Sequence, residues 1–193
     1  MKIPKRFFHL AIGSVIPLMP KCGLSSTHAA VVRSIGKSKT IVDFHKVGRP
    51  TLHHDNKPAL VPIRDAVERF KSAVWQVNRG SFKISIDEIL DGLEAGTYFN
   101  QHFHPQVDIL KGCEGCESIK LYRFPDDFQQ MLIDGGLDSL SQHRNKSTEK
   151  PNLTDEQVAR ITAYYFEDLE LFNSIQNAGQ EFNHKPKPNP VKS

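Results

Sequence analysis

The chain has 193 residues, a net charge of +3 and a hydrophobic fraction of 38%. This length fits one domain with a substantial core. The small positive excess permits an anionic ligand but does not favour a nucleic-acid-binding protein, in which lysines and arginines gather on one face. The chain has three cysteines, too few for a disulfide framework.

The N-terminal segment imitates a secretory signal, because a charged stretch at residues 1–6 precedes an apolar run at 7–19. His9 and Pro17 interrupt that run, and no stretch of the sequence approaches the ~18 apolar residues of a membrane span. We therefore expect a first core strand here, no membrane span and a cytoplasmic location.

Strand-like and helix-like segments alternate along the sequence. The strand candidates are 11–18, 40–44, 59–63 and 119–122. The helix candidates are 25–35, 65–77, a helix from a capping box at Ser85 to Gly92 or Gly96, 125–133, and one from Thr154 through Phe172. This order predicts an α/β fold with a single-domain, mostly parallel sheet flanked by helices. We expect the domain to cover 1–176 and the Lys/Pro/Asn-rich stretch 177–193 to be a flexible tail.

The first segment that indicates chemistry follows the first strand candidate. It reads Pro20-Lys21-Cys22-Gly23-Leu24-Ser25-Ser26-Thr27. Gly23 lets the backbone turn close to an anion, Lys21 supplies a cation, and hydroxyls arrive with the first N–H groups of a helix. An ordinary strand–turn–helix connection with a serine N-cap fits the same residues. The segment is not a Walker A loop, because its lysine precedes the glycine.

A second segment of the same kind follows the strand candidate at 59–63. Arg64 stands at the strand end, and Ser72 lies two helical turns later. A planar guanidinium suits a phosphate, and a helical hydroxyl can complete its binding. A surface ion pair of Arg64 with Asp65 or Glu68 is the alternative. Because ligands of open α/β sheets bind beyond the carboxyl ends of the strands, both segments point to one nucleotide site.

Together the two segments resemble the nucleotide-binding signatures of sulfotransferases that use 3′-phosphoadenosine-5′-phosphosulfate (PAPS). Residues 20–27 are similar to the 5′-phosphosulfate loop of that family, and 64–72 to its 3′-phosphate motif, Arg-Asp-Pro-x-x-Arg-x-x-Ser. Residues 100–106 are similar to the His-Phe-Arg-Pro-Gln segment of the carbohydrate-type and bacterial members. Ala66 replaces the usual proline and His104 the usual arginine.

The resemblance implies a P-loop-like sulfotransferase fold and transfer of a sulfuryl group from PAPS, without a metal. The acceptor would be a small molecule or a carbohydrate, with a carbohydrate hydroxyl favoured. The implied cofactor-binding residues are Lys21, Cys22, Gly23, Leu24, Ser25, Ser26, Thr27, Arg64 and Ser72. Lys21 would also be catalytic, by neutralising charge on the leaving phosphate oxygen.

The transfer requires a base for the acceptor proton, and neutral histidine suits this task near pH 7. Four histidines lie between the two motifs, at positions 28, 45, 53 and 54. We expect His45 to be the base, because it directly follows the strand candidate at 40–44 and would lie at the same sheet edge as Lys21. His53 and His54 are the next candidates, and an exposed turn histidine is the alternative for His45.

Two other functions remain open: a catalytically silent module that keeps the nucleotide fold, and a nucleotide or adenylyl-sulfate kinase. Cys113 and Cys116 have the spacing of a metal pair, but without a second pair they indicate a loop with two reduced thiols. Trp75 is expected in the core. The resemblance favours packing or contacts with cofactor or acceptor, over metal binding, for His102 and His104.

Overall fold

The computed structural model describes residues 7–9, 13–35, 56–81, 83–113, 115–137 and 149–182. These residues form a five-stranded sheet in the order β1-β2-β3-β4-β5. The strands are β1 (Phe7–His9), β2 (Val15–Pro17), β3 (Ala59–Arg64), β4 (Ile119–Phe124) and β5 (Gln180–Glu181). The three central strands run parallel, whereas β1 and β5 pair antiparallel at the two edges. The α/β prediction is therefore confirmed, with antiparallel edge strands added.

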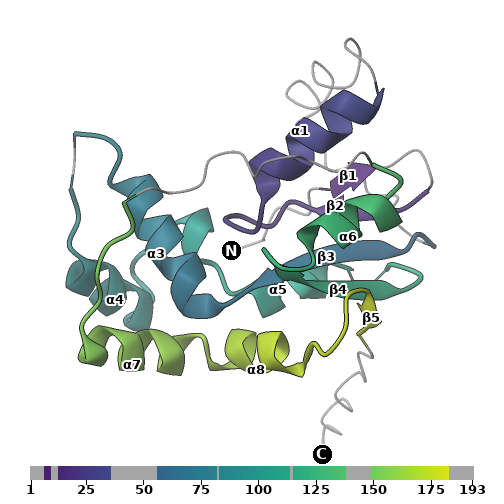
Figure 1. The fold of residues 1–193 in the computed structure, drawn as a ribbon. Coiled ribbons are helices and arrows are strands. Elements are labelled where there is room, and N and C mark those ends of the chain that lie inside the picture. Colours follow the sequence, from purple (N-terminus) through teal and green to yellow (C-terminus); the bar gives the residue numbers. More distant parts are fainter. Residues whose placement is uncertain are drawn as a thin grey trace, which may run out of the picture.

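Helices cover both faces of this sheet (Figure 1). One face carries α1 (Leu24–Ile35) and α6 (Phe128–Asp134), and the other carries α5 (Gln106–Leu110) and α8 (Phe166–Ser174). Alternate residues of β3 pack to opposite sides: Val61 joins the core beneath α5 and α8, and Leu60 joins the core beneath α1 and α6. Burial on both sides explains why β3 has an almost wholly apolar sequence.

A separate helical layer lies beside the carboxyl ends of the strands (Figure 1). It consists of α3 (Ala66–Val77), α4 (Ile86–Glu94) and α7 (Asp155–Tyr164). Two short helices flank α5 in the chain: η1 (Gln101–Phe103) precedes it and η2 (Lys111–Cys113) follows it. The rings of Phe70 and Phe103 meet edge to face at 5.3 Å in the core of this layer. The amphipathic helix predicted at 65–77 is confirmed, with Asp65 as its N-cap.

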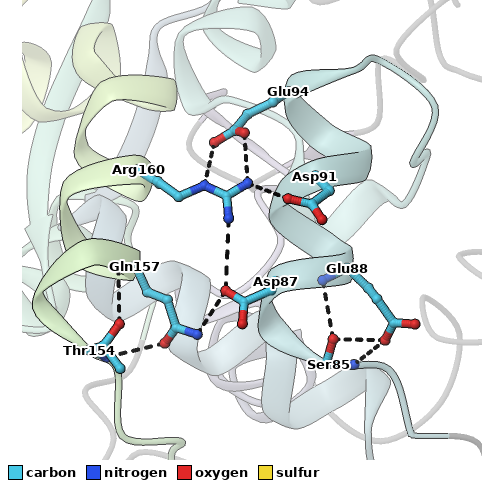
Figure 2. Close-up of polar contacts among 8 residues, drawn as sticks. All are labelled: Ser85, Asp87, Glu88, Asp91, Glu94, Thr154, Gln157 and Arg160. Atoms are coloured by element: carbon cyan, nitrogen blue, oxygen red, sulfur yellow. Dashed lines mark hydrogen bonds and ion pairs between the residues drawn. The ribbon is translucent and has the colours of Figure 1, made fainter.

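Polar contacts fix α7 against α4 (Figure 2). The predicted capping box of Ser85 and Glu88 is present at the start of α4, and Thr154 and Gln157 form a second one at the start of α7. Between the helices, Arg160 Nε and Nη2 donate to the two carboxylate oxygens of Glu94, at 2.9 and 2.7 Å. The same guanidinium contacts Asp87 and Asp91, so one side chain of α7 is placed among three carboxylates of α4.

The prediction of a single helix from Thr154 through Phe172 is wrong, because the helix is interrupted at Tyr165. That residue leaves the helical region (φ −103°, ψ 30°), and the chain continues as α8. The Tyr165 side chain is buried in the α3 core, and its hydroxyl donates to the carbonyl of Phe103 at 2.6 Å. The break lets α7 pack on the helical layer and α8 on the sheet.

The strand predictions differ from the structure at both ends of the sheet. The first strand, expected at 11–18, begins at Val15, and the candidate at 40–44 lies outside the described residues. The tail predicted from residue 177 contains β5, whose neighbour Phe182 donates its N–H to Ile119 O at 2.8 Å and packs on the core. The ordered fold therefore continues to at least Phe182.

A buried polar network connects α3, α5 and α8. The Asp168 carboxylate of α8 accepts the N–H groups of Gln106 and Val107, at 2.8 and 3.0 Å, and so caps the start of α5. The guanidinium of Arg69 in α3 lies 3.7 Å from the same carboxylate. Both charged side chains are almost fully buried, with 2% of Arg69 and none of Asp168 exposed. Burial raises the pKa of Asp168, and Arg69 opposes that shift.

No helix in the described ranges is long and apolar enough to span a membrane.

Asp168→Ala is expected to lower the free energy of unfolding by about 3–5 kcal/mol, because Arg69 would remain buried without its counter-ion. Chemical denaturation of the two proteins measures the difference. Glu170→Ala, an exposed change on the same helix, is the matched control and should shift stability by less than about 0.5 kcal/mol. Equal stability of the Asp168 variant and the control would contradict the role assigned to the network.

Candidate functional site

A cleft of about 540 Å³ lies where the central strands end. Both segments singled out from the sequence border it: Lys21, Gly23, Leu24 and Ser25 from the first, and Arg64 and Ser72 from the second. The segments are adjacent because β2 and β3 are parallel neighbours, which brings their carboxyl ends to one edge of the sheet. The volume is in the range of small-molecule sites.

Lys21 stands at the first rim of the cleft. Its backbone is in the left-handed region (φ 66°), which is uncommon for a residue other than glycine. Its ammonium lies 3.5 Å from the Gln76 side-chain oxygen and 5.9 Å from the centre of the Trp75 ring. Burial lowers the pKa of Lys21, and the nearby cations Arg64 and Arg79 lower it further. Among the described residues, no carboxylate pairs with this ammonium.

Arg64 connects the two segments. Its Nη1 donates to the Lys21 carbonyl at 2.9 Å, and its guanidinium lies 5.4 Å from the centre of the Phe124 ring. The Gln106 side chain accepts the Arg64 N–H at 2.9 Å and donates to the Arg64 carbonyl at 2.8 Å. Arg64 Nε is buried and has no hydrogen-bond partner among the described residues. The Arg64 side chain therefore connects the end of β3 to the backbone of the first segment.

Gly23 is the position where the first segment approaches the end of β4. Its φ of 81° is in the glycine-favouring region, and a Cβ there would lie 2.6 Å from Phe124 Cε2 and 2.8 Å from Phe128 Cε2. Any larger residue would displace the aromatic ring on which Arg64 packs. The glycine predicted for close approach to a ligand is thus also required for packing inside the protein.

Part of the first segment faces the core instead of the cleft. Cys22, Ser26 and Thr27 are each 1% exposed, and none lines the cleft. The Cys22 thiol donates to the Gln106 side-chain oxygen at 3.1 Å, and burial raises its pKa to about 11. Of the eight residues predicted to surround the anion, these three contribute packing through their side chains.

The second segment also divides between two faces of α3. Ser72 lines the cleft although only 4% of it is exposed. Arg69, three residues earlier, points into the core, where it donates to the backbone carbonyls of His102 and His104. The predicted pairing of Arg64 with Glu68 is loose, because the two groups lie 4.0 Å apart. Glu68 makes closer contacts with Lys71 and Lys150.

Sequence reasoning missed three side chains of the cleft wall, two on α3 and one directly after it. Trp75, expected in the core, lines the cleft with Gln76 and Arg79, and the Arg79 guanidinium lies 4.8 Å from the centre of the indole ring. These residues follow Ser72 at intervals of three, four and seven, the spacing of one helical face. Extending the face of Ser72 along the helix would have found them.

The predicted bases His45, His53 and His54 lie outside the described residues. Of the histidines whose side chains the structure describes, His102 lines the cleft. Burial lowers its pKa, and the cations Lys21 and Arg69 lower it further.

The thiols of Cys113 and Cys116 are free, with Cys113 buried in the core under α5. Within the described ranges, no group of three or more His, Cys, Asp or Glu side chains is placed to hold a metal ion.

No protein-family model, curated protein or solved structure matches the chain. Functional inference therefore starts from the cleft and its side chains.

Gly23→Ala is expected to destabilise the protein by about 1–2 kcal/mol from the left-handed backbone alone, with a further loss from contact with Phe124. Thermal and chemical denaturation measure this. Gly80→Ala is the matched control, because Gly80 has open space around its Cα and no positive φ. Equal stability of the two variants would show that the first segment relaxes at no cost.

Proposed function

We propose that this chain is a PAPS-dependent sulfotransferase with a P-loop-like sulfotransferase fold, which moves a sulfuryl group to an acceptor hydroxyl, carbohydrate favoured. One observation carries the proposal. The two segments that resemble the family's 5′-phosphosulfate and 3′-phosphate motifs border a single cleft at the carboxyl ends of parallel strands, although Lys21 and Arg64 are 43 residues apart.

The charge of the cleft supports an anionic ligand. Four cationic side chains line it, Lys21, Arg64, Arg79 and Lys150, and in the described part of the chain neither Lys21 nor Arg79 has a carboxylate partner. Repulsion between these cations contributes to the lowered pKa of Lys21. A bound phosphate would relieve that repulsion.

Two of the three carboxylates that line the cleft, Asp65 and Glu68, already interact within the protein. Asp65 accepts the Glu68 N–H at 2.9 Å as the N-cap of α3. The Glu68 carboxylate contacts Lys71 and Lys150. The Glu68 charge is therefore balanced by two lysines, and no carboxylate among the described residues pairs with Lys21.

Each cleft residue then has a distinct role. Lys21, with the first amides of α1, holds the 5′-phosphosulfate end, because the N–H groups of a first helical turn lack intrahelical acceptors. Arg64 and Ser72 hold the 3′-phosphate. PAPS supplies the activated sulfuryl group. Lys21 stabilises the negative charge that grows on the leaving oxygen, and its bracing by Arg64 keeps it in position beforehand. The base is a histidine; the sequence predicts His45, which lies outside the described residues.

Calorimetry with 3′,5′-adenosine bisphosphate tests the nucleotide site. We expect this product to bind, to bind more weakly at higher salt, and to bind far more tightly than ATP with magnesium. A preference for ATP with magnesium would favour a kinase and contradict the proposal. Binding of the bisphosphate without transfer from labelled PAPS to any member of an acceptor library, read by mass shift, would indicate a silent module.

Arg64→Ala is expected to weaken bisphosphate binding by about 2–5 kcal/mol, the cost of truncating a buried charged partner. It should also lower turnover, because the Lys21 carbonyl loses its brace. Lys21→Ala should reduce turnover more than bisphosphate affinity, because its charge matters most on the leaving group. Lys111→Ala, a 60% exposed side chain outside the cleft wall, is the control. Unchanged affinity and turnover in both cleft variants would refute the assignment.

A further inference from the structure

We propose that His102 accepts the proton of the acceptor hydroxyl during the proposed sulfuryl transfer, an inference that rests on the proposed function. His102 belongs to η1 and lines the same cleft as Lys21, Arg64 and Ser72. The other histidines with described side chains, His28 and His104, do not line it.

The backbone of His102 is fixed from both sides. Its N–H donates to the Asn100 side-chain oxygen at 3.0 Å, and its carbonyl accepts from Arg69 Nη1 at 3.2 Å. The next residue, Phe103, is 1% exposed and meets Phe70 edge to face. These contacts hold the backbone of His102 at the cleft wall, which limits how far its side chain can move.

The surroundings of the imidazole disfavour its charged form. His102 Nδ1 is buried without a hydrogen-bond partner in the described part of the chain, so Nε2 is the ring nitrogen that would meet an acceptor hydroxyl. The charged groups that act on the ring are the cations Lys21 and Arg69, and they lower the pKa of His102 together with burial. The carboxylates of the cleft wall are Asp65, Glu68 and Asp126.

In the proposed reaction, the neutral imidazole of His102 and the cation of Lys21 have different roles. As the acceptor oxygen bonds to sulfur, the bond from sulfur to the leaving phosphate oxygen breaks, and that oxygen keeps the electron pair. The acceptor proton passes to an imidazole nitrogen of His102, which later releases it to water. Lys21 stabilises the leaving oxygen, so the two residues act at opposite ends of the transfer.

The protonation of His102 can be measured without turnover. NMR titration of the histidine ring signals, assigned by comparison with His102→Gln, should give a pKa below the ordinary value of about 6.5. Lys21→Met removes a nearby cation and should move that pKa upward, and binding of 3′,5′-adenosine bisphosphate should move it upward as well. A His102 pKa that responds to neither change would overturn the inference.

Turnover gives the second test. His102→Gln should lower the rate of sulfuryl transfer by about 10²–10⁴-fold while bisphosphate affinity, which also reports folding, stays within a few-fold. The wild-type rate should fall as pH drops through the His102 pKa, and this acid limb should be absent from the residual activity of His102→Gln. Added imidazole should partly restore His102→Gly.

His104→Gln is the matched control, because its side chain is two residues away and does not line the cleft; its rate and pH profile should match the wild type. If His102→Gln transfers the sulfuryl group at the wild-type rate, this inference alone is overturned. The same holds if His45→Gln loses both the transfer and the acid limb of the pH profile. Absence of transfer by the wild type to every acceptor overturns the proposed function and the inference with it.

Discussion

The side-chain amide of Gln106 is the contact on which the cleft depends. It accepts a hydrogen bond from the Arg64 N–H and donates one to the Arg64 carbonyl, and it also accepts a hydrogen bond from the Cys22 thiol. One fully buried side chain of α5 therefore fixes the ends of two strand-to-helix connections from the face of the sheet opposite α1. Asp168 in turn holds Gln106 by its backbone. Residues far from any ligand thus set the separation of the two cationic segments.

Three cations of the cleft lie against neutral groups of the protein. Lys21 lies near the Gln76 amide and the Trp75 ring, Arg79 lies against the same ring, and Arg64 packs on Phe124. Aromatic faces and amide oxygens attract cations without cancelling their charge. The cleft therefore keeps a positive field, at a cost in folding stability that the buried core offsets.

The sequence predicted those parts of the fold that local chemistry determines. The apolar pattern of β3, the amphipathic pattern of α3 and the capping box at Ser85 each depend on neighbouring residues, and each is present in the structure. The helix break at Tyr165 and strand β5 depend on distant partners, Phe103 and β4, that no local pattern indicates.

The sequence also predicted those parts of the cleft that short local patterns determine. Lys21, Gly23, Arg64 and Ser72 stand in short patterns with a chemical meaning, and all four border it. Cys22, Ser26 and Thr27 share the pattern but not the cleft, since the direction of a side chain at a helix start is decided by packing. The resemblance favoured packing or contacts with cofactor or acceptor for both His102 and His104; His102 lines the cleft and His104 does not.

Strand β5 has a consequence for handling this protein. Without it, β4 would present a row of unpaired N–H and carbonyl groups, and such bare sheet edges pair with other chains and aggregate. The edge is covered by only a few backbone bonds, from Gly179, Phe182 and the β5 residues between them. A shortened variant that ends before Gly179 would keep every cleft residue and yet lose solubility, so a purification tag belongs beyond Phe182 and never in its place.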